Sequence, residues 1–373
     1  MRKFKRYLYD QVKKDLSKKM VFLGGPRQVG KTTLVKEFLG KNKIGYLNWD
    51  IEQDRDKILK RQWPLTKILI LDEIHKYKSW RNLLKGLYDQ YHEEKKILVT
   101  GSARLDYYRF GGDSLQGRYH YLRMHPLSIA ELKINTEKDL LKLLELGGFP
   151  EPFFSSSKIE SLRWSNEYRS RLIEEDLRSL EQVQDLGNIE LLAIRLPQLV
   201  GSPLSINAIR EDLQVSHKTI NNWLSILERL YSIFRLSPFG SPQIRAVKKE
   251  QKHYHFDWTL IEEISLRFEN MVACHLLKWV HFKHDTEGKN LELRYFRDTD
   301  GREVDFVICN KDKPIQAIEC KWKNKEISKS LKYFQQKFPD CSCIQISAIG
   351  DSKYLSQEGI LVTPAVQYLK SLI

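Results

Sequence analysis

The sequence predicts an α/β protein with three structural parts. These are a parallel sheet covered by helices, a helical middle with a helix–turn–helix, and a mixed α/β end. Short apolar segments alternate with helical segments between residues 20 and 124, and residues 127–200 have a helical pattern throughout. Alternating polar and apolar strands follow after residue 290. The chain of 373 residues is also too long for one ordinary domain.

The first part is predicted element by element from its apolar periodicity. Phe4, Leu8, Val12 and Leu16 recur at helical spacing, which predicts an amphipathic helix over residues 2–17. Apolar runs predict strands at 20–23, 44–49, 67–71, 96–100 and 119–124, and helices are expected between them at 30–40, 52–60 and 80–91. This alternation is typical of a parallel sheet with helices on its faces.

The remaining elements follow from breaks and from changes of period. Glycines 147 and 148 and serines 155–157 interrupt the helical middle. The last third predicts helices at 261–280 and 326–337, and strands at 292–297, 302–308, 315–322, 343–347 and 360–362. We therefore expect four segments, at 1–135, 136–200, 201–240 and 241–373.

The net charge of +14 lies mainly in the first segment. Residues 1–140 hold 30 basic and 17 acidic groups, whereas residues 241–373 hold 21 and 18. A basic excess favours polyanionic partners such as nucleotides, nucleic acid or a membrane surface. No apolar run is long enough to span a membrane, so a membrane-spanning segment is excluded. Of these partners, nucleotides and nucleic acid are expected, and a membrane is not. Five cysteines without a CxxC spacing exclude a disulfide framework and predict a cytoplasmic protein.

A phosphate-binding loop is predicted directly after the first strand. Residues 25–32 match the pattern GxxxxGK[ST], with an apolar strand before the loop and a helical pattern after it. Lys31 can reach the β and γ phosphates of ATP, and the Thr32 hydroxyl can ligate Mg²⁺. The predicted nucleotide contacts are Gly25, Pro26, Arg27, Gln28, Val29, Gly30, Lys31, Thr32 and Thr33.

Two carboxylates end the strand predicted at 67–71. Asp72 is placed to hold Mg²⁺, and Glu73 is placed to polarise the attacking water. The strand at 96–100 runs into Ser102, a candidate to sense the γ phosphate, with Thr100 as the alternative. Arg104 and Arg118 are candidates to stabilise transition-state charge, either within one chain or across to a neighbouring copy.

These motifs together resemble a known family. The order GGPRQVGKTTL, LDEIHKYKSW, LVTGSARL and SLQGRYHYLRMHPLSIAEL is similar to the prokaryotic AAA-type ATPases that carry a C-terminal domain of unassigned function. The resemblance covers essentially the whole chain. It implies an ATP-dependent protein with a five-stranded parallel core, and it implies no particular substrate.

A helix–turn–helix is predicted within residues 203–236. Residues 205–213 form the first helix, Gln214-Val215-Ser216 the turn, and residues 217–230 the second helix, with Ile220, Leu224 and Leu227 facing inward. The segment holds four basic and three acidic groups, which is weak for a DNA-binding surface. Packing against protein is therefore favoured, and DNA binding is the alternative.

The C-terminal segment carries a set of carboxylates suited to a metal ion. Asp305 lies on one predicted strand, Glu319 and Lys321 share a face of the next, and Glu269 lies in the preceding helix. Oxygen ligands of this kind suit Mg²⁺, and a nearby lysine can help to activate water. The spacing D–x13–E–x–K resembles the PD-(D/E)XK restriction-endonuclease-like superfamily, although no proline precedes Asp305. The alternative is a nuclease-like fold used only for binding.

The sequence thus predicts a Mg²⁺-dependent ATPase that acts on or with DNA, with a metal-dependent nuclease step as a further expectation. The competing hypothesis is an ATP-driven switch whose C-terminal domain binds a protein and cuts nothing. A homo-oligomer is expected if an arginine acts in a neighbouring copy.

Overall fold

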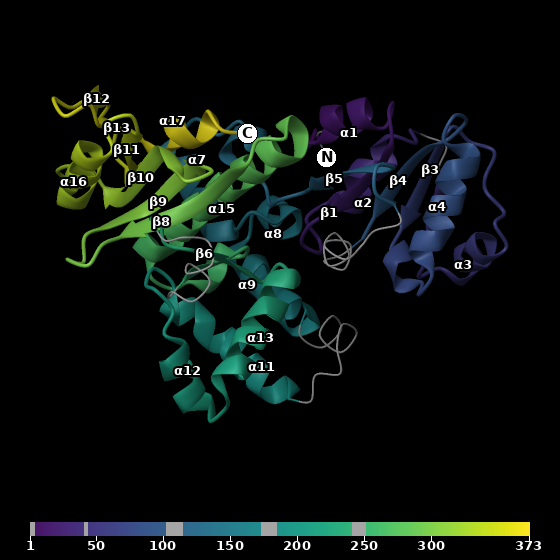
Figure 1. Cartoon of the computed structure of the whole chain (residues 1–373), viewed down its shortest axis with the longest axis horizontal. Coiled ribbons are helices and arrows are strands. Elements are labelled where there is room, and N and C mark those ends of the chain that lie inside the picture. The colour runs from purple at the N-terminus through teal and green to yellow at the C-terminus, as the bar shows by residue number, and fades with distance from the viewer. Residues whose placement is uncertain (1–3, 41–43, 102–114, 173–184, 241–250) are drawn as a thin grey trace. The chain divides into compact units, whose positions relative to one another are not determined.

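The computed structural model describes residues 4–40, 44–101, 115–172, 185–240 and 251–373 (Figure 1). Contacts divide the chain into two compact units, residues 1–125 and 126–373. The first contains a five-stranded parallel sheet and the second a six-stranded mixed sheet, so the predicted fold class is confirmed. The finer division into four segments stays a prediction.

The sheet of the first unit has the strand order β2-β3-β4-β1-β5, and all its neighbours are parallel. Its strands are β1 (Met20–Gly24), β2 (Tyr46–Asn48), β3 (Ile68–Asp72), β4 (Lys96–Thr100) and β5 (Tyr119–Arg123). Because β4 lies between β1 and β3, its last residue, Thr100, lies between Gly24 at the end of β1 and Asp72 at the end of β3. The carboxyl ends of parallel strands share one edge, which is the usual place for a ligand in such folds.

Helices cover both faces of this sheet. They are α1 (Tyr9–Asp15), α2 (Lys31–Glu37), α3 (Glu52–Leu59) and α4 (Trp80–Tyr91), with a short 3₁₀ turn, η1 (Ile74–Lys76). Met20 and Phe22 of β1 pack with Leu84 of α4, while the intervening Val21 and Leu23 are fully buried on the other face. Burial of both faces explains why the strands are continuously apolar.

The first helix is shorter than predicted and begins at Tyr9. Leu8, Val12 and Leu16 are buried as the periodicity predicts. The residues before Tyr9 are not helical, and the side chain of Arg6 is instead bonded to backbone carbonyls of the phosphate loop and of β5's exit.

The helical part of the second unit follows the predicted interruptions. Its elements are α6 (Ile129–Leu132), α7 (Glu137–Leu146), α8 (Pro150–Ser155), α9 (Lys158–Arg171), α11 (Leu186–Arg195) and the 3₁₀ turn η4 (Leu196–Leu199). Gly147 ends α7 with a φ of 84°, which favours glycine. Ser157 caps α9 by accepting a hydrogen bond from the backbone N–H of Glu160.

The predicted helix–turn–helix is confirmed as a structural element. It consists of α12 (Ile206–Leu213) and α13 (His217–Arg229), with Gln214 in the left-handed region and Ser216 capping α13. Ile220, Leu224 and Leu227 are fully buried, as predicted. Two antiparallel strands that the sequence did not predict, β6 (Ile233–Leu236) and β7 (Lys252–His255), follow the helices. Together they resemble the wing of a winged helix.

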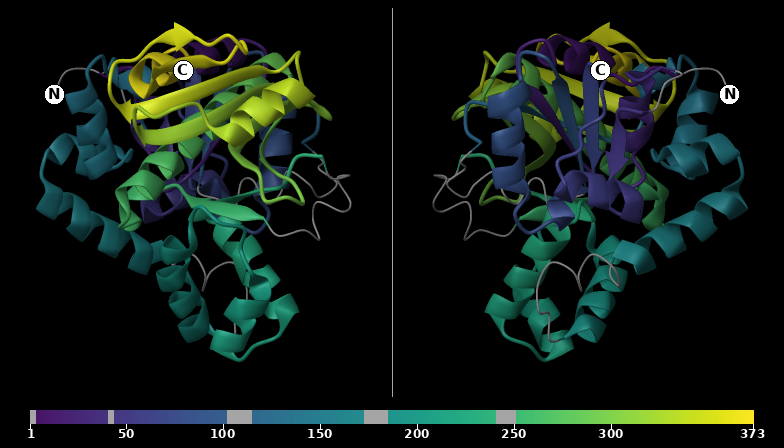
Figure 2. Two further views of the ribbon diagram at one scale, coloured as in Figure 1. Left: turned by 90° about the vertical axis from the view of Figure 1, so that its left-hand side faces the viewer. Right: turned by 90° about the vertical axis from the view of Figure 1, so that its right-hand side faces the viewer.

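The second sheet has the order β12-β13-β11-β10-β9-β8, and its strands are coloured from green to yellow in Figure 2. The strands are β8 (Leu291–Arg297), β9 (Glu303–Asn310), β10 (Lys313–Lys323), β11 (Ser342–Ile349), β12 (Tyr354–Leu355) and β13 (Leu361–Pro364). A 3₁₀ turn, η5 (Trp258–Leu260), leads into α15 (Ile264–Glu287), which packs on the sheet together with α16 (Lys329–Lys337) and α17 (Ala365–Lys370). The sequence missed β12 and α17 because both are short.

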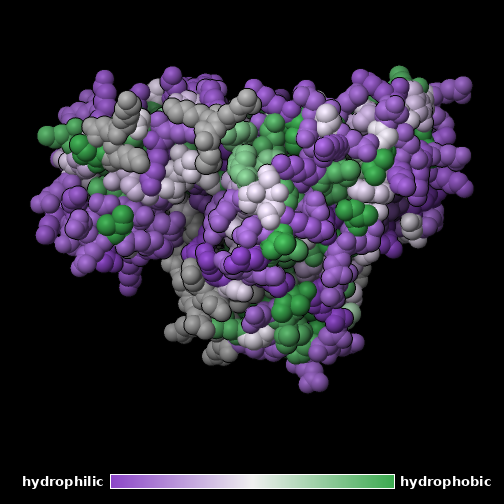
Figure 3. All heavy atoms as spheres, turned by 180° about the vertical axis from the view of Figure 1, so that it is seen from behind, coloured by the Kyte–Doolittle hydropathy of each residue, from purple (hydrophilic) through white to green (hydrophobic). Residues whose placement is uncertain are grey.

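The surface is mostly hydrophilic on the face drawn in Figure 3, with scattered apolar side chains. Leu65, Ile159 and Leu355 are the most exposed large apolar residues among those described, at 100%, 71% and 69%. They lie on different elements, and single exposed apolar residues are common. Within the described ranges, no helix combines the length and the apolar character that crossing a bilayer requires.

Candidate functional site

The phosphate loop is shaped by positive φ angles. Gly25 has a φ of 128°, Gln28 of 56° and Gly30 of 97°. A Cβ on Gly25 would lie 2.2 Å from the carbonyl oxygen of Met124, so no larger residue fits there. Gly30 is the N-cap of α2, which turns the positive end of the helix toward the loop. The backbone therefore has the shape of a phosphate-binding loop, and the predicted anion binding stays a prediction.

Lys31 lies inside this loop. The residue is 8% exposed, and its ammonium group donates to the carbonyl oxygens of Gly25 at 2.8 Å and Pro26 at 2.5 Å. The side chain thus folds back along the loop, where a phosphate would meet both the ammonium group and the backbone N–H groups. The predicted role of Lys31 toward the phosphates stays a prediction.

Asp72 is the centre of the polar network at the sheet edge. It is 4% exposed, and its Oδ2 accepts hydrogen bonds from Thr32 at 3.0 Å and from the Tyr46 hydroxyl at 2.6 Å. The hydroxyl of Thr100, which pairs with Asp72 across β3 and β4, donates to Oδ1. The sequence named Thr100 as the alternative to Ser102 for sensing the γ phosphate, whereas in the structure its hydroxyl is bonded to the Asp72 carboxylate.

Glu73 has an unusual backbone conformation for a non-glycine residue, with a φ of 55°. Its N–H donates to the Thr100 carbonyl at 3.0 Å, and its side chain is 23% exposed. The carboxylate lies 3.6 Å from His75 Nε2 and 3.6 Å from Lys76 Nζ. Burial, the largest influence, raises the pKa of Glu73, and Lys76 opposes it. A carboxylate with a raised pKa, at the edge beside the loop, suits a general base.

Two residues of this site were missed from the sequence. Tyr46 comes from β2, and its only signal was its position within the strand predicted at 44–49. Arg6 is 6% exposed, and its guanidinium donates to the carbonyl of Val29 and, at 2.5 Å, to that of His125. It therefore ties the phosphate loop to the exit of β5. Nothing local in the sequence distinguishes Arg6 from the basic residues around it.

Of the remaining predicted site residues, only Arg118 can be placed. Ser102 and Arg104 lie outside the described residues. Arg118 precedes β5, and Tyr119 pairs with Met20, the first residue of β1. Arg118 therefore lies at the edge of the sheet opposite the loop, about 15 Å away along the strand. Its guanidinium forms a bidentate pair with Asp89 of α4, at 2.7 and 3.2 Å. A role toward the phosphates of its own chain does not fit this position.

The residues at the nucleotide site fit Mg²⁺ by their donor chemistry. The Thr32 hydroxyl and the Asp72 carboxylate are 3.0 Å apart, and both are oxygen donors of the kind that Mg²⁺ prefers. Lys31 would supply positive charge for the phosphates of a nucleotide bound with such an ion.

In the second unit, the predicted acids are brought together by strand pairing. β9 and β10 are antiparallel, with Phe306 opposite Ile318, which places Asp305 beside Glu319. Asp305 accepts a hydrogen bond from the Cys320 N–H at 2.8 Å, and Lys321 donates to Glu319 at 2.7 Å. We call Glu269, Glu303, Asp305 and Glu319 the acid cluster.

Burial and mutual repulsion dominate the chemistry of this cluster. Burial first, and Asp305 next, raise the pKa of Glu269 to about 8 and that of Glu319 to about 7. Burial also raises the pKa of Asp305. Glu269 accepts a hydrogen bond from Tyr254 at 2.8 Å. Carboxylates this crowded hold a proton or a cation.

Besides Lys321, the acid cluster contains a buried lysine that the sequence did not single out. Lys252 of β7 is fully buried, and its ammonium group is ion-paired with Glu303 and lies 3.7 Å from Glu269. Among the residues that the structure describes, no group of three or more His, Cys, Asp or Glu side chains is arranged to hold a metal ion. The cluster as it stands therefore does not fit the metal that the nuclease-like resemblance implies.

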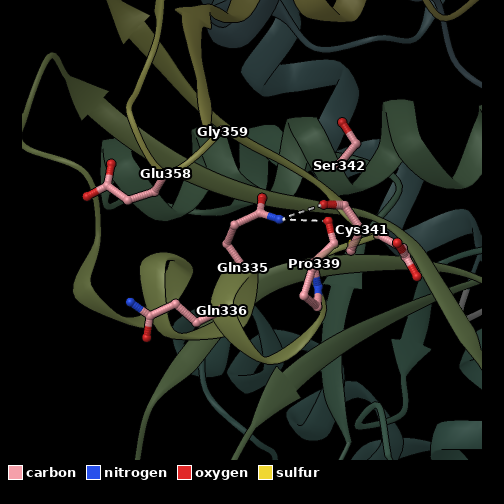
Figure 4. Close-up of a pocket in the computed structure, with 8 residues that line it drawn as sticks. Gln335, Gln336, Pro339, Cys341, Ser342, Glu358 and Gly359 are labelled. Atoms are coloured by element: carbon pink, nitrogen blue, oxygen red, sulfur yellow. Dashed lines mark hydrogen bonds between the residues drawn. The ribbon is translucent and has the colours of Figure 1, made fainter.

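A surface hollow elsewhere in the second unit has no link to these sites (Figure 4). It is lined by the end of α16, the start of β11 and the turn at Glu358 and Gly359. The Gln335 amide donates to the carbonyls of Pro339 and Cys341, both at 3.2 Å. Its lining contains none of the predicted site residues.

Three family profiles match consecutive parts of the chain. Residues 17–133 match an AAA domain, residues 137–269 a domain of unknown function (DUF8612), and residues 267–368 a second domain of unknown function (DUF4143). The first match agrees with the parallel sheet and the phosphate loop. Residues 17–133 are therefore similar to AAA-type P-loop domains, which supports the AAA-type ATPase that the resemblance implied. The restriction-endonuclease-like resemblance of the C-terminal end stays a prediction.

Similar proteins extend over most of the chain. An uncharacterized protein of Mycobacterium tuberculosis, Rv2008c, is 22% identical over 365 residues, covering 94% of this chain and 81% of the relative. An uncharacterized protein of Methanocaldococcus jannaschii, MJ1637, is 23% identical and covers 66% of this chain and 64% of the relative. RuvB of Thermotoga maritima is 16% identical, with a TM-score of 0.28 over 61% of this chain and 88% of RuvB. A TM-score this low supports no assignment, so the similarity to AAA domains rests on the family profile.

Proposed function

We propose that the N-terminal unit binds ATP with Mg²⁺ and hydrolyses its terminal phosphate bond. The observation that carries this proposal is the network around Asp72, which joins the loop threonine Thr32 to the carboxyl ends of β3 and β4. Glu73 follows in a conformation that holds its carboxylate at the same edge. The AAA-domain match over residues 17–133 supports the same activity.

Each residue has a distinct role in the proposed reaction. Lys31 and the loop N–H groups bind and orient the phosphates. Thr32 and Asp72 hold Mg²⁺, which neutralises charge on the phosphates when it is bound. Glu73 accepts a proton from the attacking water as general base. Arg6 keeps the loop in place through the Val29 carbonyl.

Hydrolysis is tested by measuring phosphate release from ATP with and without Mg²⁺. Lys31→Ala is expected to abolish nucleotide binding, and Glu73→Gln to keep binding while slowing turnover by about a hundredfold or more. Lys60→Ala, at the end of α3, is the control for a simple loss of surface charge. Turnover that persists in both site variants would show that the assigned site is wrong.

A second copy of the chain is the proposed location for the action of Arg118. Because Arg118 lies at the far edge of the sheet, it is too distant to act on a nucleotide in the phosphate loop of its own chain. The proposed role is therefore to stabilise the transition state in a neighbouring copy. The proposal requires a homo-oligomer that forms or tightens with nucleotide.

For the second unit, we propose the non-catalytic switch: the ATP cycle changes how this unit binds a partner. The ammonium group of Lys252 within the acid cluster supports this over a metal-dependent nuclease step. Incubation of plasmid with the protein and Mg²⁺ or Mn²⁺ tests both. Cleavage that disappears in Asp305→Ala and in Lys321→Ala would favour the nuclease, and absence of cleavage favours the switch.

DNA is a second candidate partner, through α13. His217, Lys218 and Asn222 are exposed on this helix, whereas Asn221 bonds back to the His217 carbonyl at 3.1 Å. A salt series of DNA binding distinguishes DNA from a protein partner. Affinity that falls steeply with salt, with a smaller slope for Lys218→Ala, supports phosphate contacts, and a flat response contradicts them.

A further inference from the structure

Lys252 is one of the largest side chains that the fold buries completely. Its ammonium group is in contact with Glu303, lies 3.7 Å from Glu269, and is 5.6 Å from the centre of the Tyr295 ring. A buried ammonium group is costly unless carboxylates compensate its charge. The acid cluster provides that compensation from two elements, α15 and β9.

The charge of this ammonium group is maintained by the cluster itself. Burial, the largest single influence, lowers the pKa of Lys252, but Glu269, Asp305 and Glu303 together raise it above the ordinary value. Lys252 and the carboxylates therefore stabilise one another. The cluster has the cation that it needs from within the chain.

The backbone fixes Lys252 in this position. The residue pairs with Leu236 of β6 and forms an isolated bridge with Pro203, and the Leu204 N–H donates to the preceding carbonyl, that of Gln251, at 2.9 Å. Because the backbone of Lys252 is paired on both sides, its position, and so the placement of its side chain in the cluster, is set by the fold. Moving it out would require displacing β7.

We propose that Lys252 is the resident cation of the acid cluster and that it excludes divalent metal ions from it. The C-terminal unit then works without a metal, even though its acids have the spacing of a metal-dependent nuclease. This inference rests on the proposed non-catalytic role of the second unit and is independent of ATP hydrolysis in the first.

The proposal predicts that removing the ammonium group opens a divalent site. Lys252→Met keeps the length and apolar part of the side chain but leaves the carboxylates uncompensated. These carboxylates then offer oxygen ligands to a hard cation. Lys252→Arg keeps the positive charge and should continue to exclude metal.

The test is a titration of the nucleotide-free full chain with Mn²⁺, followed by the electron paramagnetic resonance signal of the free ion. All proteins carry Asp72→Ala, so that the ATP site does not contribute. We expect no binding below about 1 mM for the Lys252 and Lys252→Arg proteins, and binding at least ten times tighter for Lys252→Met. Adding Asp305→Asn to Lys252→Met should remove that binding. Lys321→Met, which removes the other lysine paired with the cluster, is the matched control and should not bind.

Binding by the Lys252 protein as tight as that of Lys252→Met would overturn the proposal, as would tight binding that survives Asp305→Asn. If Lys252→Met folds only when Mn²⁺ is present, as judged by thermal unfolding, the metal has replaced the ammonium group and the proposal is supported. If Lys252→Met does not fold with or without Mn²⁺, the test rests on the protein that keeps Lys252. Sub-millimolar Mn²⁺ binding by that protein, removed by Asp305→Asn, would contradict the proposal that Lys252 excludes metal. Absence of Mn²⁺ binding would support it. Failure of ATP hydrolysis affects none of these outcomes.

Discussion

The hydroxyl of Tyr46 donates a 2.6 Å hydrogen bond to the same oxygen of Asp72 that accepts from Thr32. Asp72 is thus held by three hydroxyl groups, from β2, β4 and the start of α2. A carboxylate fixed in this way would keep one orientation toward an ion that it and Thr32 would hold. Tyr46 is therefore a positioning residue for the proposed Mg²⁺ site.

Tyr46→Phe is expected to weaken Mg²⁺ binding without changing nucleotide binding in its absence. One hydrogen bond to a charged group contributes about 1.5–3 kcal/mol, which corresponds to a half-saturating Mg²⁺ concentration that is higher by about tenfold or more. Fluorescent nucleotide titrations at fixed Mg²⁺ levels measure this directly. Tyr88→Phe on α4, whose ring stacks on His92, is the matched control. Equal Mg²⁺ dependence in both variants would contradict the role of Tyr46.

Glu73 predicts the acid side of the pH profile of hydrolysis. A general base must be ionised, and burial raises the pKa of Glu73 above the ordinary 4.5. The rate should therefore fall, as pH decreases, at a pH above that ordinary value. Lys76 lowers this pKa from 3.6 Å, so Lys76→Met should move the fall to still higher pH. An unchanged profile, measured as kcat against pH, would mean that Glu73 is not the base.

Arg6 predicts a link between the N-terminal segment and the phosphate loop. Arg6→Ala leaves the buried carbonyls of Val29 and His125 without this donor, which costs about 2–4 kcal/mol of unfolding free energy. Urea unfolding followed by tryptophan fluorescence measures the loss, and ATP affinity should fall with it. Arg6→Lys should restore part of both. The exposed pair of Lys5 with Asp10 offers the control, since Lys5→Ala should change stability by less than about 0.5 kcal/mol.

Arg118 predicts an activity that depends on protein concentration. If it acts on a neighbouring copy, ATP turnover per chain should rise with concentration, and Arg118→Ala should remove that rise. The baseline rate at low concentration should stay the same. Asp89→Ala, which frees the guanidinium from its bidentate partner, should keep the rise. Turnover independent of concentration in the unmodified chain would argue against a role in trans.

Much of the nucleotide site was predictable because its parts are local in sequence. A phosphate loop is a strand, a glycine-rich turn and a helix in succession, so residues 25–33 indicate it without distant information. Asp72 and Glu73 follow directly from a buried strand. The carboxyl ends of parallel strands meet at one edge, so strand assignment was enough to place these acids near the loop.

The acid cluster was half predictable for a related reason. Alternation along a strand placed Glu319 and Lys321 on one face, and Asp305 was placed on the strand predicted just before it. Pairing then brought Asp305 beside Glu319. Lys252 was not predictable, since the run KKEQKHYH looks like a solvated charged segment.

The sequence by itself determined the α/β class, the AAA-type phosphate loop and the helix–turn–helix, because each depends on short-range periodicity or a contiguous motif. Tertiary structure alone decided that Arg6 supports the loop, that Tyr46 holds Asp72, that Arg118 lies at the opposite sheet edge, and that Lys252 enters the acid cluster. These facts depend on strand order and on the pairing of segments far apart in the chain. Local patterns do not encode such pairings. A lysine or arginine side chain can be stable either in water or beside a buried carboxylate, and the neighbouring residues in the sequence do not show which environment it has.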